Sequence, residues 1–437
     1  PGDNMSGSAL SLALGDNDVI ITNAPGVGNG DIFVEDAVTW GTTNTLSLRA
    51  SRDVIISGDI TTTNGSLDVS FGRDVIVDAA ISATNGNVSI CCGRDLDVTA
   101  RAAITTLNGS ILLAAGRDAT VDGALSATDG NIMICAARDL SIGAAITVTD
   151  GSDIPAQSLG LPRGLVLSAG YGATSPGEGG TLTFEPTAPT TAVTNAPAAI
   201  YFNPVSYVPP FDHEPQFSLT EGAVLTQYML VFPEVASKTF DGTTTATLTG
   251  LKGLPPGVTL VAGSGANAQF SSATPGVDKT VIFSGYTLDV ADPNTANYAF
   301  AVPNCCGPVE LRTSGDITAV DTPLPPPRPP RPRPPAPAPA PLPPVSQPVV
   351  PASGGTDRVV GNWNLPVIPV AQETPYRLTV APLAPVGPVL LALESPAPVP
   401  VAPAPIVVPV EVAPPVLVAP PAPRRVVPVR PPKQDRN

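Results

Sequence analysis

The stretch that decides the fold runs from residue 72 to residue 92 and reads GRDVIVDAAISATNGNVSICC. Apolar and polar residues alternate along most of it, which is the period of a β-strand rather than of a helix. The stretch opens with a glycine and the pair Arg73-Asp74, and it carries the turn-forming pair Asn85-Gly86 in its second half. Both pairs recur on either side, so these 21 residues are one unit of an internal repeat.

The two marker pairs keep a common register along residues 52–151. The Arg-Asp pairs are spaced by 21, 21, 23 and 21 residues, and the Asn-Gly or Asp-Gly pairs by 21, 23, 21 and 21. One two-residue insertion near residues 100–103 displaces both, so the period is structural rather than compositional. The pairs are Arg52-Asp53, Arg73-Asp74, Arg94-Asp95, Arg117-Asp118 and Arg138-Asp139, then Asn64-Gly65, Asn85-Gly86, Asn108-Gly109, Asp129-Gly130 and Asp150-Gly151.

Apolar residues align from unit to unit into five columns. No unit can bury its apolar face alone, whereas stacked units pair each backbone with the coil above or below, at about 4.8 Å. The repeat therefore predicts an all-β fold, a parallel β-helix with about 21 residues per coil, about eight coils and a length of about 40 Å. The columns are Val54, Val75, Leu96, Ala119, Leu140; Ile56, Val77, Val98, Val121, Ile142; Ile60, Ile81, Ile104, Leu125, Ile146; Leu67, Val88, Ile111, Ile132; and Val69, Ile90, Leu113, Ile134.

Proline divides the chain into segments of different character. Of the 55 prolines in 437 residues, 36 lie in residues 321–437 and none lies between residues 26 and 154. This composition argues against one compact globular enzyme. We expect a β-helix shaft at residues 1–184, a Pro-rich linker at 185–210, a small β domain at 211–320 and a Pro-rich, low-complexity tail at 321–437.

Charge limits the partners. Residues 1–320 hold 12 basic and 31 acidic residues, a net charge of −19, whereas the tail holds 10 and 6. Such an acidic body repels phosphate backbones and anionic lipids, so we expect no nucleic acid or membrane surface as main partner. No apolar run of 18 residues lacks a proline or a polar break, so no transmembrane helix is expected. A start at Pro1, without a signal peptide, indicates a mature product or a fragment.

The shaft resembles a known bacterial family. The runs Asn29–Val34, Ala37–Trp40 and Leu46–Ala50, with the repeated Gly-Arg-Asp, are similar to the shaft of filamentous-haemagglutinin-like exoproteins exported by two-partner secretion. The resemblance covers about residues 1–200. It implies an extracellular, cell-surface adhesin that forms a fibre or filament for attachment or a biofilm matrix, and an outer-membrane secretion partner.

A second resemblance lies beyond the repeat. The run Lys238–Thr244, followed by Lys279–Gly285 and Ala296–Tyr298, resembles the small β domains called YDG or MBG repeats, which occur in large bacterial surface adhesins. Phe240 stands where the family usually has tyrosine, which keeps an aromatic ring at this position. The strands expected in this segment are Gln216–Leu219, Ala246–Leu251 and Thr280–Phe283.

Catalysis is not expected. A β-helix enzyme that cleaves polysaccharides needs carboxylates, or a base with a metal, converging on one face. Here the repeated aspartates lie at turns beside arginines, and the single histidine, His213, lies in a Pro-flanked segment where we expect it on the surface. We therefore expect no enzyme and no catalytic, cofactor-binding or metal-binding residue. A carbohydrate-active β-helix lyase or hydrolase is the alternative from another class.

Two outward-facing ladders are candidates for binding. The Arg-Asp columns are either a ligand stripe or a set of charges that neutralise each other while aspartate serves the turns, and we favour the second. The other is a hydroxyl ladder, interrupted by Leu107, of the kind that orders water on some β-solenoids; ice or crystal binding is thus an alternative function, although threonine is also ordinary on exposed strands. The hydroxyl ladder consists of Thr61, Thr63, Ser82, Thr84, Thr105, Ser126, Thr128, Thr147 and Thr149.

The five cysteines form neither a recognisable disulfide framework nor a zinc pattern. Cys91 and Cys135 occupy equivalent places two coils, or about 9.6 Å, apart. This exceeds the reach of about 7 Å between the Cα atoms of a disulfide, so they are expected to fill a ladder as small residues.

The ends of the chain indicate self-association. Residues 8–14 alternate as a strand would, which leaves the first coil without a cap and open to another subunit. The tail is either a spacer or a docking segment that adds its Val-rich stretches, such as residues 406–412, to an exposed edge. The expected partners are other copies of the chain, end to end or through the tail, and a host or matrix glycan or protein as receptor.

Overall fold

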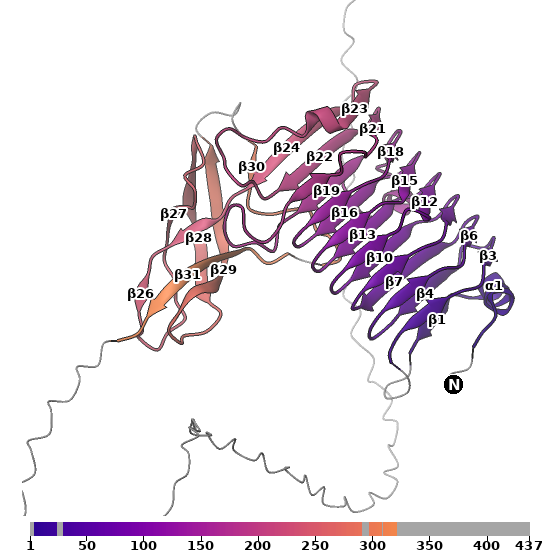
Figure 1. Ribbon diagram of the computed structural model, residues 1–437, viewed down its shortest axis with the longest axis horizontal. Coiled ribbons are helices and arrows are strands. Elements are labelled where there is room, and N and C mark those ends of the chain that lie inside the picture. Colours follow the sequence, from indigo (N-terminus) through magenta and orange to yellow (C-terminus); the bar gives the residue numbers. More distant parts are fainter. Residues whose placement is uncertain (1–3, 24–28, 291–296, 308, 321–437) are drawn as a thin grey trace, which may run out of the picture. The chain divides into compact units, whose positions relative to one another are not determined.

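The computed structural model describes residues 4–23, 29–290, 297–307 and 309–320. Three parallel sheets of ten, seven and eight strands, here called sheets A, B and C, wind into a β-solenoid of about nine turns. Successive turns add one strand after another to sheet A, as the labelled series from β1 to β22 shows (Figure 1). The parallel β-helix predicted from the repeat is confirmed.

The strands of each sheet follow one another at about the repeat period as far as β18 and at longer intervals after it. Sheet A contains β1 (Val19–Thr22), β4 (Thr45–Arg49), β7 (Ser66–Gly72), β10 (Val88–Cys92), β13 (Ile111–Ala115), β16 (Ile132–Ala136), β19 (Leu165–Ala169), β22 (Pro197–Phe202), β24 (Val224–Leu230) and β30 (Tyr298–Ala299). Sheet B contains β2 (Ile32–Val34), β5 (Val54–Ile56), β8 (Val75–Val77), β11 (Leu96–Val98), β14 (Ala119–Val121), β17 (Leu140–Ile142) and β20 (Leu182–Phe184). Sheet C contains β3 (Val38–Trp40), β6 (Ile60–Thr62), β9 (Ile81–Ala83), β12 (Ala103–Thr106), β15 (Ala124–Ala127), β18 (Ile146–Val148), β21 (Thr191–Thr194) and β23 (Phe217–Thr220).

The five apolar columns form the interior. Parallel pairing sets residues one repeat apart directly opposite each other, as in Val88 against Ile111 and Ile111 against Ile132. All the column residues are at most 2 % exposed. Because each strand of sheets A and B contributes two of these columns and each strand of sheet C one, every added coil extends the same core.

The glycine of each Asn-Gly turn permits the coils to approach. A Cβ atom on Gly86 would lie 1.7 Å from the carbonyl oxygen of Gly65, and one on Gly109 would lie 2.0 Å from that of Gly86. Only a residue without a side chain fits between backbones at this distance. The turn marker therefore recurs because the stack requires a glycine at that corner of each coil.

The N-terminal end of the solenoid is capped, which corrects the expectation of another strand. Residues Gly7–Asp16 form helix α1, whose N-cap is Ser6 and whose Leu10 and Leu14 are buried. The backbone N–H of Thr39, on β3, donates to Ser11 Oγ at 2.9 Å, so the helix occupies the place of a strand on sheet C. Leucines four residues apart fit a helix face as well as alternation fits a strand, and the cap decides between them.

The solenoid extends beyond the expected boundary at residue 184. Strands β21 and β22 lie within the segment expected to be a linker, and they continue sheets C and A. The expected strand at residues 216–219 is β23, which also belongs to the solenoid rather than to the small domain. The boundary was misplaced because longer Pro-rich connections break the 21-residue period while the strands themselves persist.

A small, mostly antiparallel domain follows, in which only β26 and β31 pair in parallel among the strand pairs of the described residues. It contains β25 (Pro233–Val235), β26 (Lys238–Thr239), β27 (Leu248–Leu251), β28 (Val258–Phe270), β29 (Gly276–Val290) and β31 (Arg312–Thr318), arranged as a pair, β25-β27, and a four-stranded sheet ordered β26-β31-β29-β28. Val235, Phe270, Val281, Phe283 and Ile317 form its core with two alanines. The expected strands at residues 246–251 and 280–283 correspond to β27 and to part of β29. The predicted tail, residues 321–437, lies outside the described residues.

Candidate functional site

The hydroxyl ladder lies in register on the outer face of sheet C. Thr61 is opposite Ser82, Ser82 opposite Thr105, Thr105 opposite Ser126, and Ser126 opposite Thr147. The ladder is linked through its side chains at one step, where Thr105 Oγ1 donates to Ser82 Oγ at 3.1 Å. Strand spacing places successive hydroxyls about 4.8 Å apart along the solenoid.

A second column of the ladder runs beside the first, in the turns that follow the strands of sheet C. Leu107, 46 % exposed, interrupts it as the sequence indicated. Two residues before each hydroxyl residue of the first column, from Ser82 to Thr147, the outward residue is an alanine, at positions 80, 103, 124 and 145. The outer face of sheet C is therefore small, uncharged and rich in hydroxyls across these coils. The second column contains Thr63, Thr84, Thr128 and Thr149.

The Arg-Asp columns form a second ladder, in which each arginine bonds to the aspartate of the preceding coil. Arg73 Nη2 lies 2.9 Å from Asp53 Oδ2, and Arg94 pairs in the same way with Asp74. At several steps the aspartate also accepts the backbone N–H of the next aspartate, as Asp53 Oδ1 does from Asp74 at 3.2 Å. Burial raises the pKa of Asp74, but the bonds from Arg94 and from the Asp95 backbone outweigh it and hold that pKa below its usual value. This is the mutual neutralisation that the sequence favoured.

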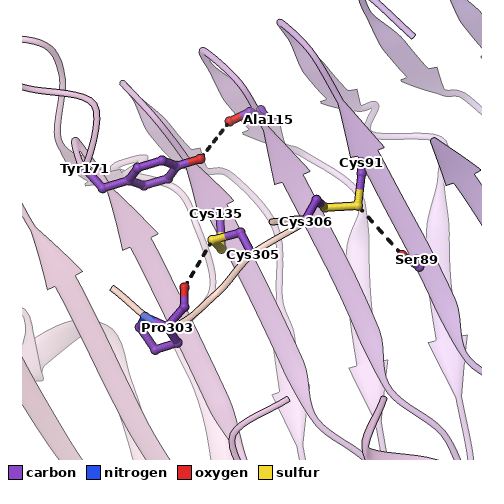
Figure 2. The surroundings of a disulfide bond; sticks show 8 residues. All are labelled: Ser89, Cys91, Ala115, Cys135, Tyr171, Pro303, Cys305 and Cys306. Carbon is purple, nitrogen blue, oxygen red and sulfur yellow. Dashed lines mark hydrogen bonds between the residues drawn. A yellow bond between two sulfur atoms is a disulfide. The ribbon is translucent and has the colours of Figure 1, made fainter. Parts of the chain in front are cut away.

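Four cysteines form two disulfides, which corrects the expectation that Cys91 and Cys135 only fill space. Cys91 is bonded to Cys306 and Cys135 to Cys305, with Cα–Cα distances of 5.9 Å and 6.3 Å (Figure 2). We call these four residues and their two bonds the clamp. Cys91 and Cys135 do not bond to each other, as their spacing required.

The clamp spans three neighbouring strands of sheet A. Cys91 on β10 and Cys135 on β16 flank Ala114 on β13 in one outward column. Their separation of about 9.6 Å is bridged because adjacent Cα atoms in Cys305-Cys306 add about 3.8 Å to the reach of the two disulfides. The bonds join residues 215 and 170 positions apart. The repeat period cannot reveal pairing between cysteines so far apart in the sequence. The sequence did hold a signal of it, because two cysteines share one outward column and an adjacent pair, Cys305-Cys306, lies outside the repeat.

The outer face of sheet A around the clamp is apolar and covered. Leu112, Met133 and Val166 point outward from β13, β16 and β19, yet they are at most 6 % exposed. Together with Leu159 and Leu161, from the connection after β18, they form a cluster that also includes Cys305. That connection contains α2 (Pro155–Ser158) and is held on sheet A by hydrogen bonds, with Ser110 Oγ donating to the Gln157 carbonyl at 2.6 Å.

A cavity of about 480 Å³ lies beside the clamp, lined by Cys92, Ala115, Tyr171, Cys305, Cys306 and Arg312 among others. The Tyr171 hydroxyl donates to the Ala115 carbonyl at 3.4 Å (Figure 2). Cys92 is a free thiol and 8 % exposed, and burial raises its pKa to about 11. A thiol in this state is almost entirely protonated at neutral pH and therefore exchanges slowly with the neighbouring disulfides.

His213 is buried, in contrast to the expected surface position. Its ring centroid lies 4.7 Å from that of Phe202 and 4.5 Å from that of Phe211, and the residue is 3 % exposed. Its Nδ1 atom has no hydrogen-bond partner, and burial lowers the pKa of the ring to about 4. The Pro-flanked segment carries the histidine inward because it packs against the last strands of the solenoid.

The described residues lack a metal-binding cluster and a membrane-spanning helix. No cluster of three or more His, Cys, Asp or Glu side chains there is placed to hold a metal ion. No helix among residues 4–23, 29–290, 297–307 and 309–320 has the length and apolar character needed to cross a membrane.

Comparison with known families identifies a YDG domain at residues 230–305. The match begins at the end of β24 and ends at Cys305, so Cys305 and Cys306 of the clamp lie at the C-terminal limit of the match. The predicted resemblance to YDG repeats is confirmed, with narrower limits than the expected 211–320. Comparison with curated proteins and with solved structures finds no match.

Proposed function

We propose that this chain is an extracellular structural and adhesive protein of a bacterial cell surface, exported by two-partner secretion like the filamentous-haemagglutinin-like exoproteins its repeats resemble. In this role it forms part of a fibre or filament that serves attachment or a biofilm matrix. The YDG domain and the β-solenoid are compatible with such a protein.

The clamp is the observation that carries this proposal. Disulfides form and persist in oxidising compartments outside the cytosol. Cys91 and Cys135 are each bonded to a partner at least 170 residues away, and the remaining thiol, Cys92, is buried. An extracellular location gives these bonds the environment that they require.

Protease treatment and labelling of cysteines test the location. We expect the protein in the culture medium or on the cell surface, open to added protease on intact cells. After denaturation of freshly harvested material, we expect one cysteine to be alkylated before reduction and five after it. Protection from protease in intact cells, together with five alkylated cysteines before reduction, would contradict the proposal.

The outer face of sheet C is the adhesive surface in this proposal. Its hydroxyls and alanines leave it uncharged, whereas the Arg-Asp ladder lies at the corner between sheets A and B. Such an uncharged face suits contact with an extended glycan or matrix polymer. A second candidate function, binding to an ordered solid such as ice, rests on the same register of hydroxyls.

A matched pair of variants tests the surface. Thr105→Arg with Ser126→Arg changes the outer face of sheet C, whereas Thr120→Arg with Ser141→Arg changes the outer face of sheet B, where these residues pair in register. We expect the first double variant to lose most attachment of protein-coated beads to matrix polymers, and the second to retain it. Equal attachment by the two double variants would show that the outer face of sheet C is not the adhesive surface. Thermal hysteresis of freezing that is lost only in the sheet C variant would favour ice binding.

We further propose that the protein performs no catalysis. The repeated aspartates are engaged by arginines and by backbone N–H groups, and the histidine is buried among aromatic rings. We expect no lyase or hydrolase activity on pectin, alginate, glucans or glycosaminoglycans. Turnover that disappears on substitution of one repeat aspartate would establish the enzyme instead.

A further inference from the structure

The clamp creates a short covalent path through the chain. Residues Cys91 and Cys306 are separated by 215 positions along the backbone but only by 5.9 Å between their Cα atoms. Between them lie the solenoid strands from β11 to β24 and most of the YDG domain. The inner bond, Cys135–Cys305, encloses 170 positions of the same segment.

We propose that the clamp is a mechanical bypass, which carries tension between the two ends of the chain from β10 directly to Cys306. A pull on residues after Cys306 passes through the disulfide to Cys91, so the residues between the two cysteines bear no load. Only the first coils, with α1 at their N-terminal end, and the segment from Cys306 onward remain in the path. The proposal rests on the proposed function only in that a surface-attached protein is subject to pulling.

The surroundings of the clamp are those of a durable bond. Its anchor strands, β10 and β16, each pair on both sides within sheet A, so neither anchor is at a sheet edge. The middle residue of the column, Ala114, is 4 % exposed and small enough to leave room beneath the adjacent cysteines. The nearby thiol of Cys92 is held protonated by burial, which disfavours the exchange that would reshuffle the bonds.

The bypass also explains why two bonds are present rather than one. If the outer bond, Cys91–Cys306, is broken, the inner bond, Cys135–Cys305, carries the tension. Only the residues between the two bonds can then extend. At about 3.3–3.6 Å per extended residue, the outer bond hides about 700–770 Å of chain and the inner bond about 560–610 Å. The clamp thus holds back two lengths of chain, which become available to extension one after the other as the two disulfides break.

Single-molecule pulling of the full chain from its two ends tests the proposal, at forces that unfold domains without breaking disulfides. We expect the oxidised protein to extend about 700–770 Å less than the Cys305→Ser, Cys306→Ser double variant. Cys305→Ser, which keeps the outer bond, shows the same shortfall as the oxidised protein, whereas Cys306→Ser shows about 560–610 Å.

Total unfolded length counts only the residues outside closed disulfide loops, so a count of free thiols in each variant first establishes that its remaining bond has formed. The reduced wild-type protein serves as a second reference for full extension. Full extension of the oxidised protein, or the same shortfall for both single variants, would overturn the bypass. A bypass in a protein found inside cells would contradict the proposed function and leave the mechanical inference intact.

Discussion

The outer faces of sheets A and C are built by the same coils, yet the face of sheet A is covered by other parts of the chain and the face of sheet C is open. On sheet A the outward residues Leu112 and Met133 are apolar, and the chain folds back to cover them with residues 154–161 and the clamp. On sheet C the outward residues Thr105 and Ser126 carry hydroxyls, and Thr105 remains exposed. All five residues of β13 and of β16 are buried, whereas in the central strands of sheet C the middle outward residue is not.

This difference shows that the outward residues of a solenoid decide whether each face is covered or open. The inward columns are alike in all three sheets, so they fix the stack but not its contacts. An apolar outward column recruits another part of the same chain, because leaving it in water costs free energy. A hydroxyl column leaves its face open, and such a face remains available for partners.

The largest effect is expected from a charge placed inside the stack. Ile132→Asp puts a carboxylate among apolar side chains with no partner, which should cost several kcal/mol of the free energy of unfolding. Ser126→Asp, on the outer face of sheet C in the same coil, should change it by about 0.5 kcal/mol or less. Chemical denaturation followed by circular dichroism measures both, and similar losses for the two variants would show that Ile132 does not face the interior.

Truncation of one outward residue on sheet A and one on sheet C tests whether the first face is covered and the second open. Met133→Ala removes a fully buried side chain from the covered face and should cost about 2–5 kcal/mol. Thr147→Ala, from the open face, should cost about 0.5 kcal/mol or less. A small loss for Met133→Ala would mean that the cover on sheet A is absent in solution.

A pH titration tests whether the connection around His213 covers the end of the solenoid. Burial lowers the pKa of this ring from 6.5 to about 4, so the folded protein binds fewer protons than the unfolded chain between these values. Stability should be complete above pH 6.5 and fall by at most about 3 kcal/mol as the pH drops to about 4. His213→Phe should remove this step, and its persistence in that variant would assign it to carboxylates.

The smallest effects are expected from two aspartates, Asp74 in the Arg-Asp ladder and Asp97 on β11 outside it, which should respond with opposite signs. Asp74→Asn loses the pairing with Arg94 and should lower the free energy of unfolding by about 0–1 kcal/mol. Burial and the neighbouring carboxylates of Asp122 and Asp78 raise the pKa of Asp97, so Asp97→Asn should leave stability unchanged or raise it slightly. Thermal melts at pH 7 compare them, and the same sign for both would show that ionic pairing does not decide the effect.

The interior was predictable from sequence because it is periodic in two ways. Alternation marks strands, and the 21-residue spacing aligns the columns, so the residues that face inward follow directly. Helix α1 was missed because Leu10 and Leu14 satisfy both a strand and a helix pattern. Strands β21, β22 and β24 were missed, and the expected strand β23 was assigned to the small domain, because the connections between them vary in length.

The outer contacts were less accessible to sequence reasoning. The hydroxyl ladder was found because its residues recur with the repeat. The pairing of Cys91 with Cys306 was not found, because it joins a periodic segment to a non-periodic one, and the burial of His213 depends on aromatic rings from other connections. Contacts between segments of different character have no period to reveal them.

The most direct test of the clamp is a map of the disulfides in the purified, unreduced protein. Cleavage after lysine and arginine places the bonded cysteines in three peptides, residues 74–94, 118–138 and 280–312. The account predicts that mass spectrometry finds all three joined as one species that carries a single free thiol, and that reduction separates them. Three separate peptides before reduction, or a link between 74–94 and 118–138 alone, would contradict the clamp and every inference drawn from it.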